Sequence, residues 1–487
     1  MNPIPPSLGD QQARATRQQD RYRLVTEDYG DTETIVDQWM AAQVGAAADT
    51  LGPPDLSANT LLAASVQLST PGLYGLGEPI LTHAEGHPDF IKWIAASGYW
   101  TRMQWVQRMV IGVGDWVLFF SVDAIGRLTI ENVYPWRVWT RSDPRSADRL
   151  LEVRWLRLRY KDPGNPDAGC DWFFDVYRLD PPVYQVIDAD GKDWSNVHIS
   201  VDGGFAPEGG LRGEAYPFVD ADGIAFLPFV FYADCNDGFI WHDNARRGAT
   251  VGALNSIVLG SFSLHAMIAA ALPPVIAVNL KPPPANVQGV GATNAAGSAA
   301  SRSFPTVPGT MLFTQTDPPE ANGTIHQINN SGALQSLNQG VASYQESQNS
   351  RFGISFNVQR NQANPTSAAA LSISLSEKRE RAEIVTPFFR SRDLRVLEIA
   401  ASLAYLAGGS DWPGTGWTIE YRRIPKSPDE QAAERDQLTW EVSQGFISRV
   451  DAYLRLHPGL SREEAILRLR QVAADENQIS ANPLQKE

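Results

Sequence analysis

The sequence predicts a mixed α+β protein built from several parts, and three observations support this prediction. Apolar residues in the first 245 positions switch between helical spacing and the period of two that is typical of β-strands. Two helices of medium length then flank a short, loop-rich β segment, and a much longer helix with a helical tail follows. Because 487 residues exceed one ordinary core, we expect roughly two to four domains.

The first 245 residues combine helices with strands. Apolar and aromatic residues recur at helical spacing in 34–51 and 87–116. The period then changes to two, which predicts a hairpin of two strands about Gly126 and a corner at Tyr134-Pro135. Further strands, which we expect to be antiparallel, are predicted at 150–160, 172–179 and 182–188. The Asp-Ala-Asp-Gly sequences that begin at Asp188 and Asp220 are typical of hairpin turns rather than calcium loops.

Two helices are predicted around the small β segment. The first covers 246–272, with Leu254 and Ile257 on its apolar face, and ends at a pair of prolines. The second covers 332–352, where Leu334 and Leu337 begin a narrow apolar stripe. Strand-like pieces between the helices alternate with a stretch rich in Pro, Gly, Ala and Ser. The first helix is open to a second interpretation, as an ordinary buried helix.

A polar, nearly uncharged loop at 353–365 leads into the long helix. Asn364 can cap that helix and Pro365 suits its first position. The helix extends for about 40 residues, and Pro387 inside it must kink or split it; we favour a structural kink over a moving hinge. A short strand at 417–424 and a helical tail follow, with Gly445 past the end of one tail helix.

Composition and motifs exclude several classes of protein. The net charge of −14 argues against a protein that holds nucleic acid by clustered Lys and Arg. The two cysteines give no disulfide framework, so a reducing cytoplasm is expected. No signal peptide is recognised, and the most apolar stretch carries His265 and two prolines, so no membrane span is predicted.

Motifs of catalysis are missing from the sequence. It contains no GxxxxGK[ST] motif, so the chain is not a packaging ATPase. The seven histidines show neither HExxH nor HxH spacing, and paired acidic residues stand at helix starts. We therefore predict a non-enzymatic protein with no catalytic residues, no metal site and no cofactor.

The order of these segments resembles that of bacteriophage portal proteins, which form a ring at one capsid vertex through which DNA enters and leaves. The strand–turn–strand sequence at 114–139 is similar to the portal wing, and 261–278 looks like the first stem helix entering the clip. The segment 352–383 looks like the connection to the long helix, with Thr366-Ser367 where many portals have Ser-Gly. The sequence 440–470 is similar to the C-terminal region of the family, and a Gly-Ile-Ile-Ser-like turn reads Gly445-Phe446-Ile447-Ser448.

The resemblance implies a division of the chain and a role for each part. The implied parts are a wing at 1–245, a first stem helix at 246–272, a clip at 273–331, a second stem helix at 332–352, a tunnel loop at 353–365, the long kinked helix with a returning wing strand at 366–424, and a helical crown at 425–487. By the resemblance the tunnel loop touches translocating DNA through Asn357, Gln359, Arg360, Asn361 and Gln362. A plain exposed loop is the alternative for these residues.

The resemblance also implies partners and a location. The chain would form a homo-oligomeric ring of about twelve subunits. Its partners would be double-stranded DNA in the channel, the terminase large subunit, the major capsid protein, and an adaptor or head-completion protein. The ring would belong to a virion assembled in the host cytoplasm, and no membrane would be involved. Two rival interpretations remain: a polysaccharide-active enzyme, suggested by the many tryptophans, and another virion protein of the capsid or tail tube. Paired carboxylates in a cleft would favour the enzyme.

Overall fold

The structure is a computed structural model that describes residues 8–26, 29–44, 66, 70, 72–75, 77–123, 125–162, 165, 167, 169–198, 216–235, 239–242, 247–271, 275–279, 311–314, 323–327, 331–351, 368–408, 410–422, 428–456 and 462–481. The chain divides into two compact units. The larger consists of Met1–Ala363 with Glu377–Arg423, and the smaller of Asn364–Ser376 with Ile424–Glu487. Helices and several separate sheets make up the fold, which confirms the mixed α+β prediction.

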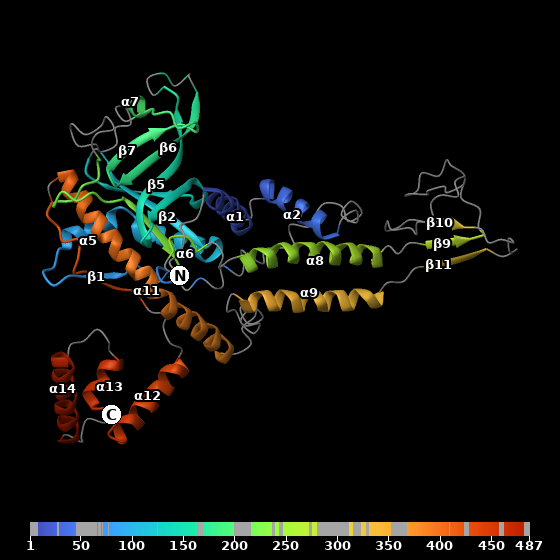
Figure 1. The fold of residues 1–487 in the computed structure, drawn as a ribbon. Coiled ribbons are helices and arrows are strands. Elements are labelled where there is room, and N and C mark those ends of the chain that lie inside the picture. Colours follow the sequence, from blue (N-terminus) through green and yellow to red (C-terminus); the bar gives the residue numbers. More distant parts are fainter. Residues whose placement is uncertain are drawn as a thin grey trace. The chain divides into compact units, whose positions relative to one another are not determined.

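The elements follow one another as Figure 1 labels them. In the first 245 residues they are α1 Leu8–Thr26, α2 Tyr29–Val44, β1 Ile80–Thr82, α5 Pro88–Ala96, α6 Tyr99–Val113, β2 Asp115–Val122, β3 Leu128–Val133, the 3₁₀ turn η3 Pro135–Arg137, β4 Val138–Asp143, β5 Ser146–Tyr160, β6 Cys170–Leu179, β7 Pro182–Ile187, α7 Ser195–His198 and β8 Phe229–Ala233. From there on they are α8 Arg247–Ala271, β9 Val275–Val278, β10 Met311–Thr314, β11 Thr324–Gln327, α9 Ser331–Arg351, α11 Ala368–Gly408, β12 Thr418–Glu420, α12 Pro428–Ser443, α13 Arg449–Leu456 and α14 Arg462–Ala481.

The strands near the start of the chain form antiparallel sheets, as the alternating pattern predicts. One sheet has the order β3-β2-β8 and another β4-β5-β6-β7, with every pairing antiparallel. The hairpin of β2 and β3 turns at Gly126, whose φ of 79° lies in the region that glycine enters without steric cost. Asp188 and Asp220 each begin a turn closed by a bond from a glycine N–H three residues on, which confirms the hairpin-turn prediction.

The segment predicted as one helix at 87–116 is two helices and the start of a strand. Helix α5 ends at Ala96, and Gly98, with φ of 71°, sets the new direction before α6 begins at Tyr99. The prediction of one helix was wrong here, because aromatic residues at helical spacing continue on both sides of the glycine.

Aromatic residues fill the core of the larger unit. Trp116 on β2 is fully buried and meets Trp105 of α6 edge-on, with 4.7 Å between the ring centroids. Trp155 on β5 lies 5.1 Å from Phe119 of β2 and so packs β4-β5-β6-β7 against the first sheet. These tryptophans pack the core, as large aromatic side chains commonly do, whereas Trp172 and Trp440 are exposed.

Helix α1 buries a polar face that the sequence analysis did not identify. Gln11, Arg14, Gln18 and Arg21 recur at spacings of three, four and three, and each is at most 7% exposed. Gln11 exchanges two 2.9 Å hydrogen bonds with the backbone of Thr140 in β4. Such bonds satisfy backbone groups at the edge of a sheet, so this polar stripe acts as a packing face.

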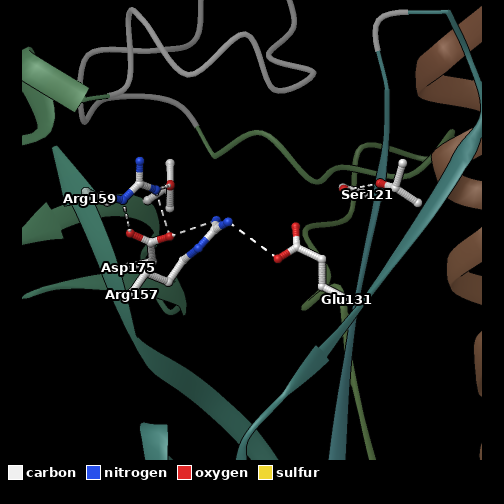
Figure 2. A network of polar contacts seen from close by, with 7 residues as sticks. Ser121, Glu131, Arg157, Arg159 and Asp175 are labelled. Atoms are coloured by element: carbon white, nitrogen blue, oxygen red, sulfur yellow. Dashed lines mark hydrogen bonds and ion pairs between the residues drawn. The ribbon is translucent and has the colours of Figure 1, made fainter. Parts of the chain in front are cut away.

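A charge network joins the sheet β3-β2-β8 to the sheet β4-β5-β6-β7 (Figure 2). Asp175 on β6 is fully buried and accepts two hydrogen bonds from Arg159, at 3.1 and 2.8 Å. Arg157 on β5 reaches the same carboxylate at 3.4 Å and, with its other terminal nitrogen, Glu131 of β3 at 3.4 Å. Burial lowers the pKa of both guanidinium groups, but Asp175 together with other nearby acidic groups and tyrosines raises it by more, so the pKa of each is raised. Asp175 is thus a buried charge that is fully paired.

Helix α11 continues without a break through Pro387. The proline lies on an exposed face, between the buried Val385 and Phe389, and no second helix starts there. Of the two outcomes expected at Pro387, the helix is not split, and a kink stays a prediction. A proline on the solvent side costs one hydrogen bond to a carbonyl that water can reach, and the buried side chains beside it hold the helix together.

The smaller unit includes helices α12, α13 and α14. Gly445, with φ of 75°, ends α12 as predicted, and the following Phe446 N–H bonds back to the Glu441 carbonyl at 3.0 Å. Phe446 also lies against Trp440, with 5.7 Å between the ring centroids, which is the hydrophobic contact that often accompanies such an end. Helix α13 starts at a reciprocal Ser448–Asp451 cap.

Candidate functional site

Helices α8 and α9 lie side by side in the larger unit and include the predicted packing residues (Figure 1). Three strands occur in the chain between them: β9 pairs with β10 in parallel and with β11 antiparallel. Strand β11 is exposed along its whole length, and its Ile325 is 62% exposed. A helix pair that carries a small three-stranded sheet between its members, with strand β11 exposed, is therefore a structural feature of this chain.

Polar contacts anchor the start of α8 to the N-terminal helices. Arg21 of α1 donates from Nε to the Thr250 hydroxyl at 2.9 Å and from Nη1 to the Val113 carbonyl at 2.9 Å. Trp39 of α2 donates from its indole nitrogen to Oδ1 of Asn255 at 2.9 Å. The bonds to Thr250 and Asn255 reach α8 and restrict its rotation about its own axis, and the bond to Val113 ties Arg21 to the end of α6.

A second set of contacts joins α8 to α9. Asn255 donates from Nδ2 to the Tyr344 hydroxyl at 3.1 Å, and Ser263 donates to Oδ1 of Asn338 at 2.7 Å. Gly252 lets the buried Gln348 amide come close: a Cβ at position 252 would lie 2.2 Å from Gln348 Oε1. Polar side chains therefore link the two helices at several points along their shared length.

The predicted packing residues divide into two groups. Leu254 and Ile257 are buried, at 6% and 2% exposure, within the core of the larger unit. Leu334 and Leu337 are only half-buried, and they begin the stripe of less exposed positions on α9. In a single chain the first group thus supports the fold of the unit, whereas the second leaves apolar area that is open to solvent.

The second half of α8 presents an apolar face to solvent. Three exposed apolar residues lie at positions i, i+3 and i+4 of the helix: Leu264 is 38%, Met267 43% and Ile268 44% exposed. The neighbouring residues on the first half, from Gly252 to Val258, are mostly buried. The same helix is therefore a core helix in its first half and an exposed apolar surface in its second half, so the alternative of an ordinary buried helix describes only the first half.

Helix α8 also contains a stretch, Thr250–Ile268, that is long and apolar enough to cross a membrane by length and composition. Its first half is packed among α1, α2 and α9, as the core helix of a folded unit is. Its partner α9 is polar and mostly exposed.

Helix α11 is fixed to the rest of the larger unit by one buried carboxylate that the sequence analysis missed. Asp393 Oδ1 accepts hydrogen bonds from the hydroxyls of Tyr99 at 2.6 Å and Tyr232 at 2.9 Å. Its Oδ2 accepts from Tyr74 at 2.8 Å and from Tyr421. Burial raises the pKa of Asp393 to about 6, against the lowering effect of the four hydroxyls. The four tyrosines come from segments far apart in sequence, so no local pattern announces the cluster.

The residues assigned to the tunnel loop, Asn357, Gln359, Arg360, Asn361 and Gln362, lie outside the described residues. Among the side chains that the structure does describe, one group of three possible metal ligands comes together, at His83, Glu85 and His87. No protein-family model matches the chain, and a search of curated proteins finds no match.

Proposed function

We propose that this chain is the subunit of a portal-type ring, a non-enzymatic assembly at a capsid vertex through which double-stranded DNA passes. In this proposal α8 and α9 form the stem, β9–β11 belong to the clip, and the elements before α8 form the wing with β12. Terminase and head-completion proteins would dock on the clip, and the major capsid protein would surround the ring.

The observation that carries the proposal is the exposed apolar face of Leu264, Met267 and Ile268 on a helix that is otherwise packed. Burying the roughly 40% of each side chain that is exposed would contribute about 1 kcal/mol per residue. A contiguous apolar face of this kind marks an interaction surface on a soluble chain. In a ring, every subunit offers this face to a neighbour, so the gain recurs at each interface.

A lipid bilayer is the other environment that would accept α8, and helix α9 argues against it. A membrane around α8 would also take in α9, which is hydrogen-bonded to α8 through Asn338 and Tyr344. Exposed positions of α9 such as Gln335 and Gln339 would then lose water without gaining hydrogen-bond partners. Neighbouring copies of the chain, with polar groups of their own, satisfy such a helix pair better.

The acidic balance of the chain fits a channel that DNA passes without adhering. Each phosphate neutralised by Lys or Arg adds affinity that depends on salt, and a net charge of −14 per subunit opposes such adhesion. The amides and the single Arg360 of the loop would supply the few phosphate contacts, multiplied by the symmetry of the ring.

Charged substitutions on α8 test the proposal. The double variant Met267→Glu/Ile268→Glu places charges on the exposed half, where they cost the single subunit little. Ile125→Glu is the matched control, because Ile125 is 69% exposed in the turn between β2 and β3. Leu254→Asp marks the opposite case, because a buried unpaired charge costs several kcal/mol and should unfold the larger unit.

We expect the double variant to melt like the parent chain but to remain monomeric in light scattering, while Ile125→Glu forms rings of the parent mass. Leu254→Asp should fail to give folded protein. Rings of parental mass from the double variant would overturn the assignment of this face to the subunit interface.

A further inference from the structure

We propose that His83, Glu85 and His87, in the turn between β1 and α5, bind one Zn²⁺ per chain. Each residue offers one ligand atom, and the three atoms lie within 4.8 Å of one another. All three come from the sequence His-Ala-Glu-Gly-His, so one short turn supplies the whole set. The inference is independent of the proposed ring, since it concerns a turn of the single subunit.

The backbone at His87 is held in a conformation that the helix start does not need. His87 is the N-cap of α5, with φ of 127° and ψ of 61°, and its side chain makes no capping hydrogen bond. Ser, Thr, Asp or Asn would normally stand there and bond to the first turn. A non-glycine residue at such a φ is strained, and strain of this kind collects at functional sites.

The His87 imidazole turns toward Glu85 instead. Its Nε2 is buried and has no hydrogen-bond partner within the part of the chain that the structure describes. Oε2 of Glu85 lies 3.6 Å from this nitrogen. A buried ring nitrogen without a hydrogen bond, beside a carboxylate, is an arrangement that a bound cation would complete.

The distances suit a tetrahedral metal. Zinc lies about 2.0–2.2 Å from His nitrogen and carboxylate oxygen, which places neighbouring ligand atoms roughly 3.4 Å apart. The separation of Glu85 and His87 is already close to this value at 3.6 Å. Glu85 is 77% exposed, so its side chain can rotate to bring the set together with His83.

His83 is positioned by the segment before β12. Its ring lies 5.0 Å from the Trp417 ring and 5.0 Å from that of His87. Gly416, with φ of 82°, leaves room for it, because a Cβ there would lie 2.9 Å from His83 Nε2. The backbone N–H of Glu85 donates a hydrogen bond to Nδ1 of His83, with 3.3 Å between the nitrogens. The metal would therefore brace the turn against residues more than three hundred positions later.

The donor set selects the class of metal. Two imidazoles with one carboxylate favour Zn²⁺ and its transition-metal neighbours over Mg²⁺ or Ca²⁺, which prefer oxygen ligands. Three protein ligands leave one tetrahedral position for water.

Metal binding by the full chain tests the proposal. Protein freed of metal with a chelator is equilibrated with Zn²⁺, and bound metal is measured by elemental mass spectrometry alongside the melting temperature. The variants are His83→Gln, Glu85→Gln and His87→Gln, with His326→Gln on the exposed strand β11 as the matched control. Glu85→Gln separates loss of metal binding from loss of the fold, since an exposed side chain can be replaced without unfolding the turn.

We expect one bound Zn²⁺ and a raised melting temperature for the parent chain and for His326→Gln. Glu85→Gln should weaken binding at least tenfold, and the histidine variants should abolish it. Substoichiometric zinc in the parent chain, or one equivalent retained in all three turn variants, would overturn the site.

Discussion

The Asp393 cluster makes the stability of the larger unit depend on pH in a direction opposite to that of most carboxylates. The carboxyl is fully buried, and burial raises its pKa to about 6 from the ordinary 3.8. That difference corresponds to about 3 kcal/mol at 1.36 kcal/mol per pH unit. The substitution Asp393→Asn isolates this contribution to stability, because asparagine keeps the shape of the side chain and cannot ionise.

The sign of the effect follows from which state holds the proton. Below about pH 4 Asp393 is protonated in both the folded and the unfolded chain, so it contributes no pH dependence. Between about pH 4 and pH 6 the unfolded chain releases the proton while the folded chain keeps it. The free energy of unfolding therefore falls by about 3 kcal/mol across this window and stays at the lower level above it.

Urea unfolding of the parent chain and Asp393→Asn at several pH values measures this effect. Tryptophan fluorescence reports on the larger unit, because Trp440 is the one tryptophan of the smaller unit and the other thirteen of the fourteen lie in the larger. Subtracting the variant from the parent cancels all other titrating groups. The difference should fall by about 3 kcal/mol between pH 4 and pH 6.5. A difference that rises with pH would refute the reasoning, since the four hydroxyls would then outweigh burial.

Two further predictions concern a charge network and a loop. Arg159→Ala should lower the free energy of unfolding by about 3 kcal/mol, because Asp175 is fully buried and would keep only the 3.4 Å contact with Arg157. The control Arg145→Ala, at an exposed position, should change the free energy of unfolding by less than about 0.5 kcal/mol. Equal losses for the two variants in urea unfolding would contradict the stabilising role of the Arg159–Asp175 pair. Deleting 355–363 should leave ring assembly intact while reducing DNA packaging in a particle assay, and a chain that no longer assembles would show that the loop is structural.

Much of the fold was predictable because it is written in local patterns. The period of two identifies β2, β3, β5, β6 and β7, and turn residues such as Gly126 and the Asp-Ala-Asp-Gly sequences mark their connections. Helices α8 and α9 follow from apolar spacing and from the prolines and glycines at their ends. Each of these signals is set by residues that are close together in the sequence.

What could not be predicted depends on contacts between distant segments. The polar stripe of α1 resembles a solvated helix face, and only its burial against β4 shows that it packs. Asp393 resembles an ordinary surface residue of a long helix, since its four tyrosine partners lie between 28 and 319 positions away. Partners at such separations leave no trace in a window of the sequence.

The possible metal ligands were missed for a different reason. His83, Glu85 and His87 alternate along one turn, and a search for HExxH or HxH spacing passes over them. A His-x-Glu-x-His pattern was the available signal. It becomes informative only when the turn folds the side chains onto one side, as the 3.6 Å approach of Glu85 to His87 shows.

The central claim is that the chain forms a ring, and the mass and shape of the purified protein test it most directly. Light scattering with negative-stain electron microscopy should show particles of about twelve subunits around a central hole. A chain that stays monomeric when concentrated, with its α8 face still exposed, would contradict the account.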